Sequence, residues 1–234
     1  MVLACIGGVF YFLSNLNAIV AQIIEDQGSQ VVATDVAVSG VDISLRDGRG
    51  TISGLSIASP AGFETRHAFT LGEITVDIDL ESVRNDPIVI DEIRVQAPVV
   101  MAEFQSSGTS NIGELQKNLQ QYAASMGGGG DAQKNEDQKR IRIKRFIFEE
   151  GRIEVDAAAI GLAERSLNLP AIRLDDIGGA GGAQPDAIAQ AVLGALTRKV
   201  TAEIARAGIE EKAKDLAKEK AEDEARGMLD KIGK

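Results

Sequence analysis

The sequence predicts an α+β protein, built as a curved antiparallel β-sheet with a helix at each end of the chain. Three observations predict it. Over residues 36–174 apolar side chains recur mainly at every second position, the period of a strand with one buried face. The first two dozen residues are uncharged and strongly apolar. Beyond Pro185 apolar residues recur at every fourth position up to Ile204, which is the period of an amphipathic helix.

Residues 1–25 are expected to form a transmembrane helix and stalk. Glu25 is the first ionisable side chain, and an uncharged stretch of this length spans a bilayer as a helix. A signal peptide requires a basic region before its apolar stretch, and nothing basic precedes Val2. A lipoprotein signal is also disfavoured, because the lipobox-like run ending at Cys5 lacks a preceding hydrophobic region. Because the first basic residue after the span is Arg46, the remainder of the chain is expected on the exported side.

Residues 26–177 are expected to form a β-rich domain. An Asp47-Gly48 turn joins the first two long strands as a hairpin, and further strands follow in a meander whose outer face is wet. A short helix is expected over 111–125, followed by a flexible Gly-rich linker at about 126–139. A second Gly-rich hinge opens the last segment, 178–234, which consists of a long amphipathic helix.

A weak internal repeat links the two sides of the linker. Apolar positions of the first copy coincide with those of the second, and Pro98 coincides with Gly151 as a turn former. The aligned apolar pairs are Ile90/Ile143, Ile93/Phe146, Val95/Phe148 and Val100/Ile153. The repeat predicts that the sheet resumes after the linker as one structure.

Composition and motifs argue against catalysis. The 234 residues carry a net charge of −10 and 4% aromatic residues, which disfavours a nucleic-acid partner. One Cys and one His leave no metal site or cofactor to predict, and His67 has no triad-type partner in its loop. Asp77 and Asp79 share a strand face, but the sequence points to no further calcium ligand. The chain is therefore predicted not to be an enzyme, with no catalytic residue, metal ligand or cofactor.

A basic run at residues 140–145 allows two interpretations. It could contact anionic lipid headgroups, or it could be the solvated face of a strand, since Arg140, Arg142 and Lys144 alternate with Ile141 and Ile143. The alternation favours the solvated face.

The order of the strand and turn motifs resembles the N-terminal part of AsmA-like envelope proteins. The resemblance covers roughly residues 1–155 and rests on these segments: Val41–Leu45, Gly48–Gly50, Ile52–Leu55, Ser59–Phe63, Ile74–Leu80, Val89–Ile93 and Gly108–Ile112. It implies a chorein-type β-groove in the periplasm, anchored in the bacterial inner membrane by a single span, with membrane lipid as partner. The present chain is too short to cross the periplasm alone, and its charged helical tail departs from the family pattern.

The apolar strand face is the candidate site. Its candidate residues are Val41, Ile43, Leu45, Ile52, Phe69, Leu71, Ile74, Val76, Ile78, Ile90, Ile93, Val95, Phe146 and Phe148, with Ile153 and Val155 beyond them. The face is either an ordinary core under the helices 111–125 and 186–205, or a groove for acyl chains. The resemblance favours the groove, and hence phospholipid binding or transfer for envelope maintenance. The alternative is a structural homo-oligomeric scaffold, assembled through strand edges and the C-terminal helix without lipid transfer.

Overall fold

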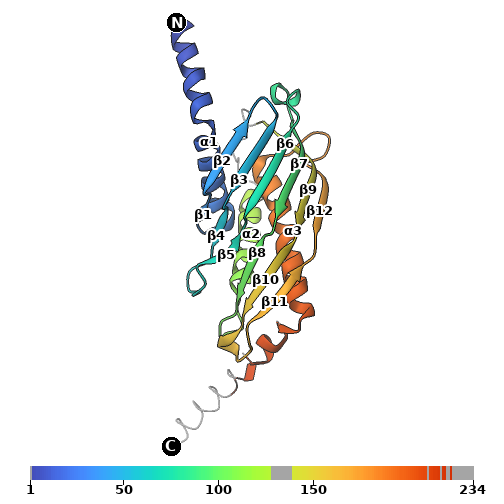
Figure 1. The fold of residues 1–234 in the computed structure, drawn as a ribbon. Coiled ribbons are helices and arrows are strands. Elements are labelled where there is room, and N and C mark those ends of the chain that lie inside the picture. The colour runs from blue at the N-terminus through green and yellow to red at the C-terminus, as the bar shows by residue number, and fades with distance from the viewer. Residues whose placement is uncertain (1, 128–138, 210, 217, 220–221, 223–234) are drawn as a thin grey trace, which may run out of the picture.

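A computed structural model describes residues 2–127, 139–209, 211–216, 218–219 and 222, with residues 2–15 and 126–127 described by their backbone alone. Among the described residues, three α-helices and two short 3-10 helices accompany the strands (Figure 1), and residues 211–216 beyond them are also helical. They are α1 (Val2–Val32), η1 (Ser82–Arg84), α2 (Asn111–Gly127), η2 (Ala158–Ile160) and α3 (Pro185–Arg206).

The strands form two six-stranded sheets. Sheet A contains, in spatial order, β1 (Val36–Ala37), β4 (Ser56–Ala58), β5 (His67–Thr70), β8 (Val99–Glu103), β10 (Gly151–Asp156) and β11 (Arg165–Leu169). Sheet B contains β2 (Gly40–Ser44), β3 (Arg49–Ser53), β6 (Glu73–Ile78), β7 (Ile88–Gln96), β9 (Ile141–Glu149) and β12 (Ile172–Ile177).

The two sheets are continuous along the chain. Their spatial orders match strand for strand, so that each strand of sheet A has its chain neighbour at the same place in sheet B. The chain passes from β7 to β8 through Ala97, and from β9 to β10 through Glu150, and both residues have positive φ angles of 46° and 57°. Left-handed backbone at these two corners turns the strand sharply, because a non-glycine residue adopts it only where the fold requires it.

The prediction of one antiparallel sheet is wrong. Strand β7 pairs with β9 in parallel, and β8 pairs with β10 in parallel, so both sheets are mixed. Parallel neighbours need a long crossover between them, and residues 104–140, which include α2, supply it. The register of these pairs places Ile90 beside Ile143 and Val100 beside Ile153. The internal repeat therefore aligns residues that are neighbours in space.

The prediction of a transmembrane helix is also wrong. No helix within the described part of the chain is long and apolar enough to cross a membrane. The single-pass inner-membrane localisation, with the body in the periplasm, rested on that helix and is not retained. Helix α1 continues past the predicted boundary at residue 25 to Val32, and two of its polar side chains bond to the edge of the sheets. Asn17 Oδ1 accepts a hydrogen bond from the Ile43 amide, and Glu25 Oε1 accepts one from the Val38 amide.

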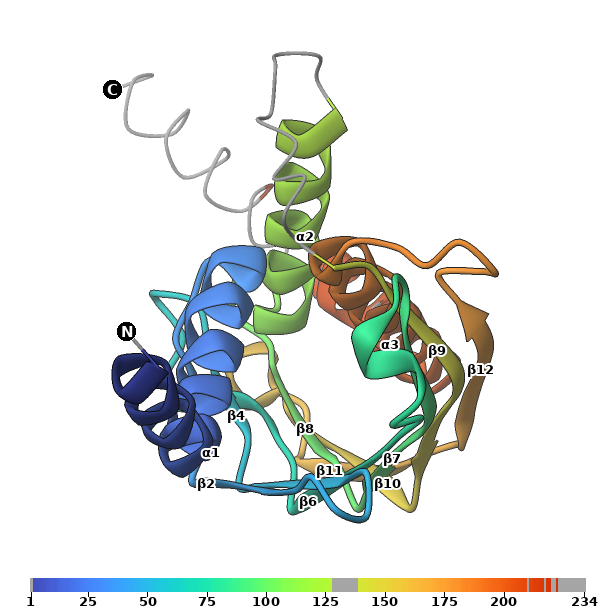
Figure 2. The same ribbon diagram turned by 90° about the horizontal axis from the view of Figure 1, so that it is seen from above.

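The helices cover one side of the bent sheets. In Figure 2 the strands curve round one side of the molecule, and α1, α2 and α3 lie across the other. Helix α1 packs beside β1 and β2, α2 beside β8, and α3 beside β11 and β12. Helices α2 and α3 coincide with the stretches predicted to be helical. The predicted linker lies largely outside the described residues, as does most of the chain beyond α3.

Candidate functional site

The side of the sheets that faces the helices carries rows of apolar side chains, which we call the inner wall. Residues in register across neighbouring strands point to the same side of a sheet. In sheet B one row consists of Val41, Ile52, Ile74, Val95, Phe148 and Ile172. The next consists of Ile43, Gly50, Val76, Ile93, Phe146 and Leu174. A third contains Ile78, Ile90, Ile143 and Ile177. Eleven of the fourteen candidate residues lie in these three rows; the sheet-A part of the wall adds Phe69.

The sheet-A part of the inner wall, the lower wall, is closed. Its main row contains Ile57, Phe69, Val100 and Ile153, which are all buried. Side chains of α2 and α3 meet this row around a small apolar cavity of about 30 Å³. The lower wall is therefore the packed core that the alternative interpretation predicted for the whole face.

The sheet-B part, the upper wall, is only partly covered. Val41, Ile43, Val76, Ile78, Ile90 and Ile93 are all half-buried, although strands flank most of them on both sides. Exposure of a side chain in mid-sheet comes through its own face, so this face is open to solvent. No helix within the described residues packs against β3, β6 or β7 to the extent that α1 packs against β2. Burial returns at Phe146 and Phe148 on β9, next to β12, where α3 packs.

The remaining candidate residues fall into two groups. Leu71 is buried at the corner between β5 and β6, where its amide donates to the Leu55 carbonyl. Leu45 lies outside the inner wall, in the β2–β3 turn, and is 51% exposed. The structure therefore brings most of the predicted residues to one face, but divides that face into a covered part and an open part.

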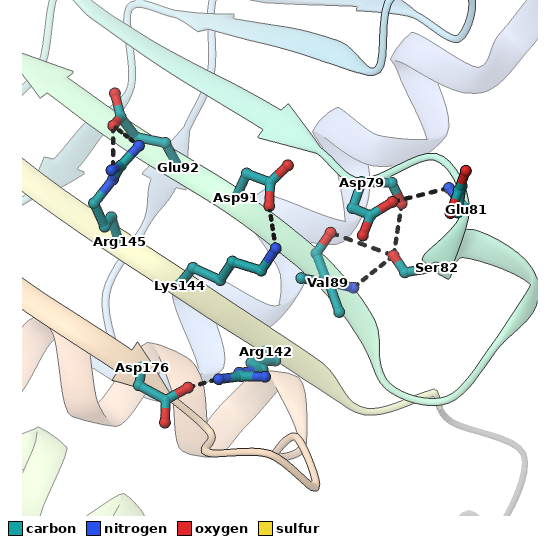
Figure 3. Close-up of polar contacts among 10 residues, drawn as sticks. All are labelled: Asp79, Glu81, Ser82, Val89, Asp91, Glu92, Arg142, Lys144, Arg145 and Asp176. Atoms are coloured by element: carbon teal, nitrogen blue, oxygen red, sulfur yellow. Dashed lines mark hydrogen bonds and ion pairs between the residues drawn. The ribbon is translucent and has the colours of Figure 1, made fainter.

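The opposite, outer side of sheet B carries ion pairs between strands. Lys144 Nζ lies 2.7 Å from Asp91 Oδ1, and an Arg145 nitrogen lies 3.0 Å from Glu92 Oε2 (Figure 3). Arg142 pairs with Asp176 on β12 at 2.6 Å. Arg140, just before β9, pairs with Asp86, and this pairing raises the arginine pKa through the hydrogen bond to the Asp86 carboxylate. The basic run is thus neutralised within the protein, which supports its interpretation as a solvated strand face.

The other polar residues considered in the sequence analysis make only local contacts or none with each other. Asp77 pairs with Arg49 on β3, and Asp79 accepts from the Glu81 amide, so the two carboxylates do not act together. No cluster of three or more potential metal-binding side chains occurs among the described residues. His67 is half-buried, and its Nδ1 has no hydrogen-bond partner among the described atoms.

Two buried polar residues, which the sequence analysis did not single out, fix the lower wall. Asn111 is fully buried at the start of α2, where its Oδ1 accepts from the Glu103 and Ile112 amides and its Nδ2 donates to the Met101 carbonyl. The Glu103 carboxylate accepts hydrogen bonds from the amides of Glu64 and Thr65. Desolvation raises the pKa of Glu103, but these backbone hydrogen bonds outweigh it, so the net shift is downward.

Comparison with known proteins adds no assignment: no protein-family model matches the chain, and no curated protein matches it significantly.

Proposed function

We propose that the upper wall binds acyl chains, and that the protein binds or transfers phospholipid. The observation that carries the proposal is the half-burial of Val76, Ile78, Ile90 and Ile93 in the middle of a sheet. Water contact with aliphatic side chains is unfavourable by roughly 25 cal/mol per Å², so an apolar occupant of this face would be stabilised. The resemblance to AsmA-like proteins supports the same ligand class.

The upper wall is suited to acyl chains rather than to polar ligands. The half-buried part of the three rows is entirely aliphatic and lies mainly on β2, β6 and β7, whereas Ile74, Val95 and the members on β9 are buried. Every side chain in the three rows is aliphatic or aromatic except at Gly50. Such a surface offers no hydrogen bond that would select a headgroup, which fits recognition of the hydrocarbon part of a lipid.

The test is lipid binding by variants that differ only in which side of β6 they change. Val76→Asp places a carboxylate on the upper wall, and Thr75→Asp places one on the outer side of the same strand. Val76→Asp is expected to weaken binding of a fluorescent fatty acid by about tenfold or more, because the charge is desolvated by the chain. Thr75→Asp should leave binding unchanged. Equal binding by two folded variants would contradict the proposal, as would the absence of phospholipid from the purified protein by mass spectrometry.

One observation favours the structural alternative. At the β1–β2 edge the Val38 and Ile43 amides bond to side chains of α1, whereas at the other edge α3 packs beside β11 and β12 and no strand follows them within the described residues. An unpaired edge can take up a strand from a second copy. Size measurement in mild detergent separates the two functions: a large assembly free of lipid favours the scaffold, and a monomer carrying phospholipid favours lipid binding.

A further inference from the structure

Three exposed aliphatic side chains lie together at the end of sheet B, and we call this region the tip. Leu45, Leu80 and Val83 are 51%, 44% and 41% exposed. The β2–β3 turn joins them, because the Ile78 amide donates to the Gly48 carbonyl at 2.6 Å. A Cβ atom at Gly48 would lie 3.1 Å from Leu80 Cγ, so Leu80 covers this turn. Val83 follows in η1, so the three side chains belong to two adjoining turns.

Cationic residues adjoin each of the two turns. Arg46 follows Leu45 and Arg84 follows Val83, while the ammonium group of Lys139 donates a hydrogen bond to the Val83 carbonyl. None of the three cations forms an ion pair with a described residue. Three carboxylates balance them. Asp47 accepts from the Ser44 hydroxyl, Asp79 accepts from the Glu81 amide (Figure 3), and Glu81 is the third. Asp86, which lies close enough to Lys139 for its pKa to be lowered by that charge, is itself paired with Arg140. The tip is therefore electrically balanced on a chain with a net charge of −10.

Two other apolar segments lie at the same end of the molecule as the tip. The N-terminal part of α1 projects past this end of the sheets (Figure 1), and residues 2–13 are uncharged in the sequence. The row of the upper wall that contains Ile78 and Ile90 is also next to the tip, since Ile78 contacts the β2–β3 turn. Apolar surface from a sheet and two turns thus meets at the end of the molecule past which the uncharged part of α1 projects.

We propose that the tip docks on the surface of a phospholipid bilayer. Leu45, Leu80 and Val83 enter the interfacial layer, and Arg46, Arg84 and Lys139 reach lipid phosphates. A bilayer stabilises each inserted side chain individually, so a small apolar patch is sufficient, and long cationic side chains can extend toward the headgroups. A second copy is a poorer fit, because a stable protein interface needs about 800 Å² from each partner, far more than three side chains provide.

The proposal stands apart from acyl binding by the upper wall. The tip could dock on a bilayer whether or not the wall takes up lipid, and the two are changed by different substitutions. If both hold, the tip brings the open end of the upper wall to the surface from which acyl chains are extracted.

A tryptophan reporter tests the insertion directly. The chain contains no Trp, so Leu80→Trp introduces a single one at the tip, and Leu216→Trp introduces one at an exposed position beyond α3. With vesicles of phosphatidylcholine and phosphatidylglycerol, Leu80→Trp emission is expected to shift to shorter wavelength and to be quenched by brominated lipid. Leu216→Trp should show neither effect. Absence of both effects at Leu80→Trp would overturn the proposal.

Flotation of the full chain with the same vesicles measures the contribution of the tip to binding. Leu45→Ser, Leu80→Ser and Val83→Ser combined are expected to lower the bound fraction at least about tenfold. The matched control is Leu216→Ser.

The cationic residues are tested separately. Arg46→Glu, Arg84→Glu and Lys139→Glu combined should weaken binding most on phosphatidylglycerol vesicles, compared with Arg152→Glu on the outer side of β10. Unchanged flotation of both tip variants would assign vesicle binding to another segment and overturn the proposal, as would concentration-dependent self-association that both variants abolish.

Discussion

The lower wall lies on sheet A and the upper wall on sheet B, and each strand of one sheet is joined along the chain to a strand of the other. The lower wall is nevertheless a packed core, whereas the upper wall is partly open to solvent. Both carry aliphatic and aromatic side chains in rows across the strands, so the strand sequences alone do not distinguish them. The difference lies in the covering elements: α2 and α3 close over Phe69, Val100 and Ile153, whereas β3, β6 and β7 receive no comparable cover from the described residues. A hydrophobic strand face is thus necessary for a lipid-binding wall, but the helices decide whether it is available.

The largest expected effect is a truncation in the lower wall. Ile153 has no exposed surface, so Ile153→Ala should lower the free energy of unfolding by about 2 to 5 kcal/mol. Ile90→Ala in the upper wall should cost about 1 kcal/mol, because this side chain is already in contact with water. Urea titration of both variants measures the contrast. Equal losses would show that the upper wall is as closely packed as the lower.

A polar truncation in the lower wall comes next. Asn111→Ala leaves the Glu103 amide and the Met101 carbonyl without their buried partner, which should cost about 1 to 3 kcal/mol. Asn168→Ala on β11, at an exposed position, serves as the control and should be close to neutral. If the two variants unfold at the same urea concentration, Asn111 does not hold α2 against sheet A.

Acid should destabilise the lower wall through Glu103. The pKa of this carboxyl is lower in the folded than in the unfolded chain, so its contribution is complete above the unfolded pKa and is lost as pH falls toward the folded pKa. Glu103→Gln should therefore be less stable at neutral pH and should lose less stability on acidification than the parent protein. Glu154→Gln, on the exposed side of β10, should keep the parental pH dependence. An unchanged acid slope in Glu103→Gln would contradict this assignment.

Helix α1 covers the β2 edge of the upper wall. Glu25→Ala and Asn17→Ala remove the acceptors for the Val38 and Ile43 amides, each at a cost of about 1 kcal/mol. Hydrogen exchange at these two amides should accelerate about tenfold, while exchange at Val95, in the sheet centre, stays slow. Unaltered exchange at Val38 and Ile43 would show that α1 does not protect this edge.

The smallest effect is expected on the outer side of the upper wall. Lys144→Ala removes the pair with Asp91, in which both side chains are nearly half exposed, and should change the free energy of unfolding by at most about 1 kcal/mol. Acyl binding should not change, since the inner wall is untouched. A large loss of stability would mean that the outer ion pairs, and not the inner rows, hold β7 to β9.

Sequence patterns predicted which residues share the inner face better than they predicted the topology. The period of two assigned Ile74, Val76 and Ile78 to one face because alternation in a strand is a local property. Ile90 and Ile93 are three positions apart, and they share that face because the pairing of β6 with β7 shifts register between Asp77 and Ile78. The parallel pairing was missed, although a signal was present: Asp91-Glu92 in one copy of the repeat aligns with Lys144-Arg145 in the other. Opposite charges at aligned positions are typical of neighbouring strands in register, which is where the structure places them.

What the sequence determined by itself is the local pattern: where strands and helices form, which side chains share a face, and which segments repeat. What only the tertiary structure decided is the partner of each apolar surface. Asn17 and Glu25 of α1 bond to a sheet edge, and α2 and α3 bury the lower wall while part of the upper wall stays open. Local periodicity depends on neighbours along the chain, whereas coverage depends on packing among segments as far apart in the sequence as α1 and α3, which no single stretch of sequence encodes.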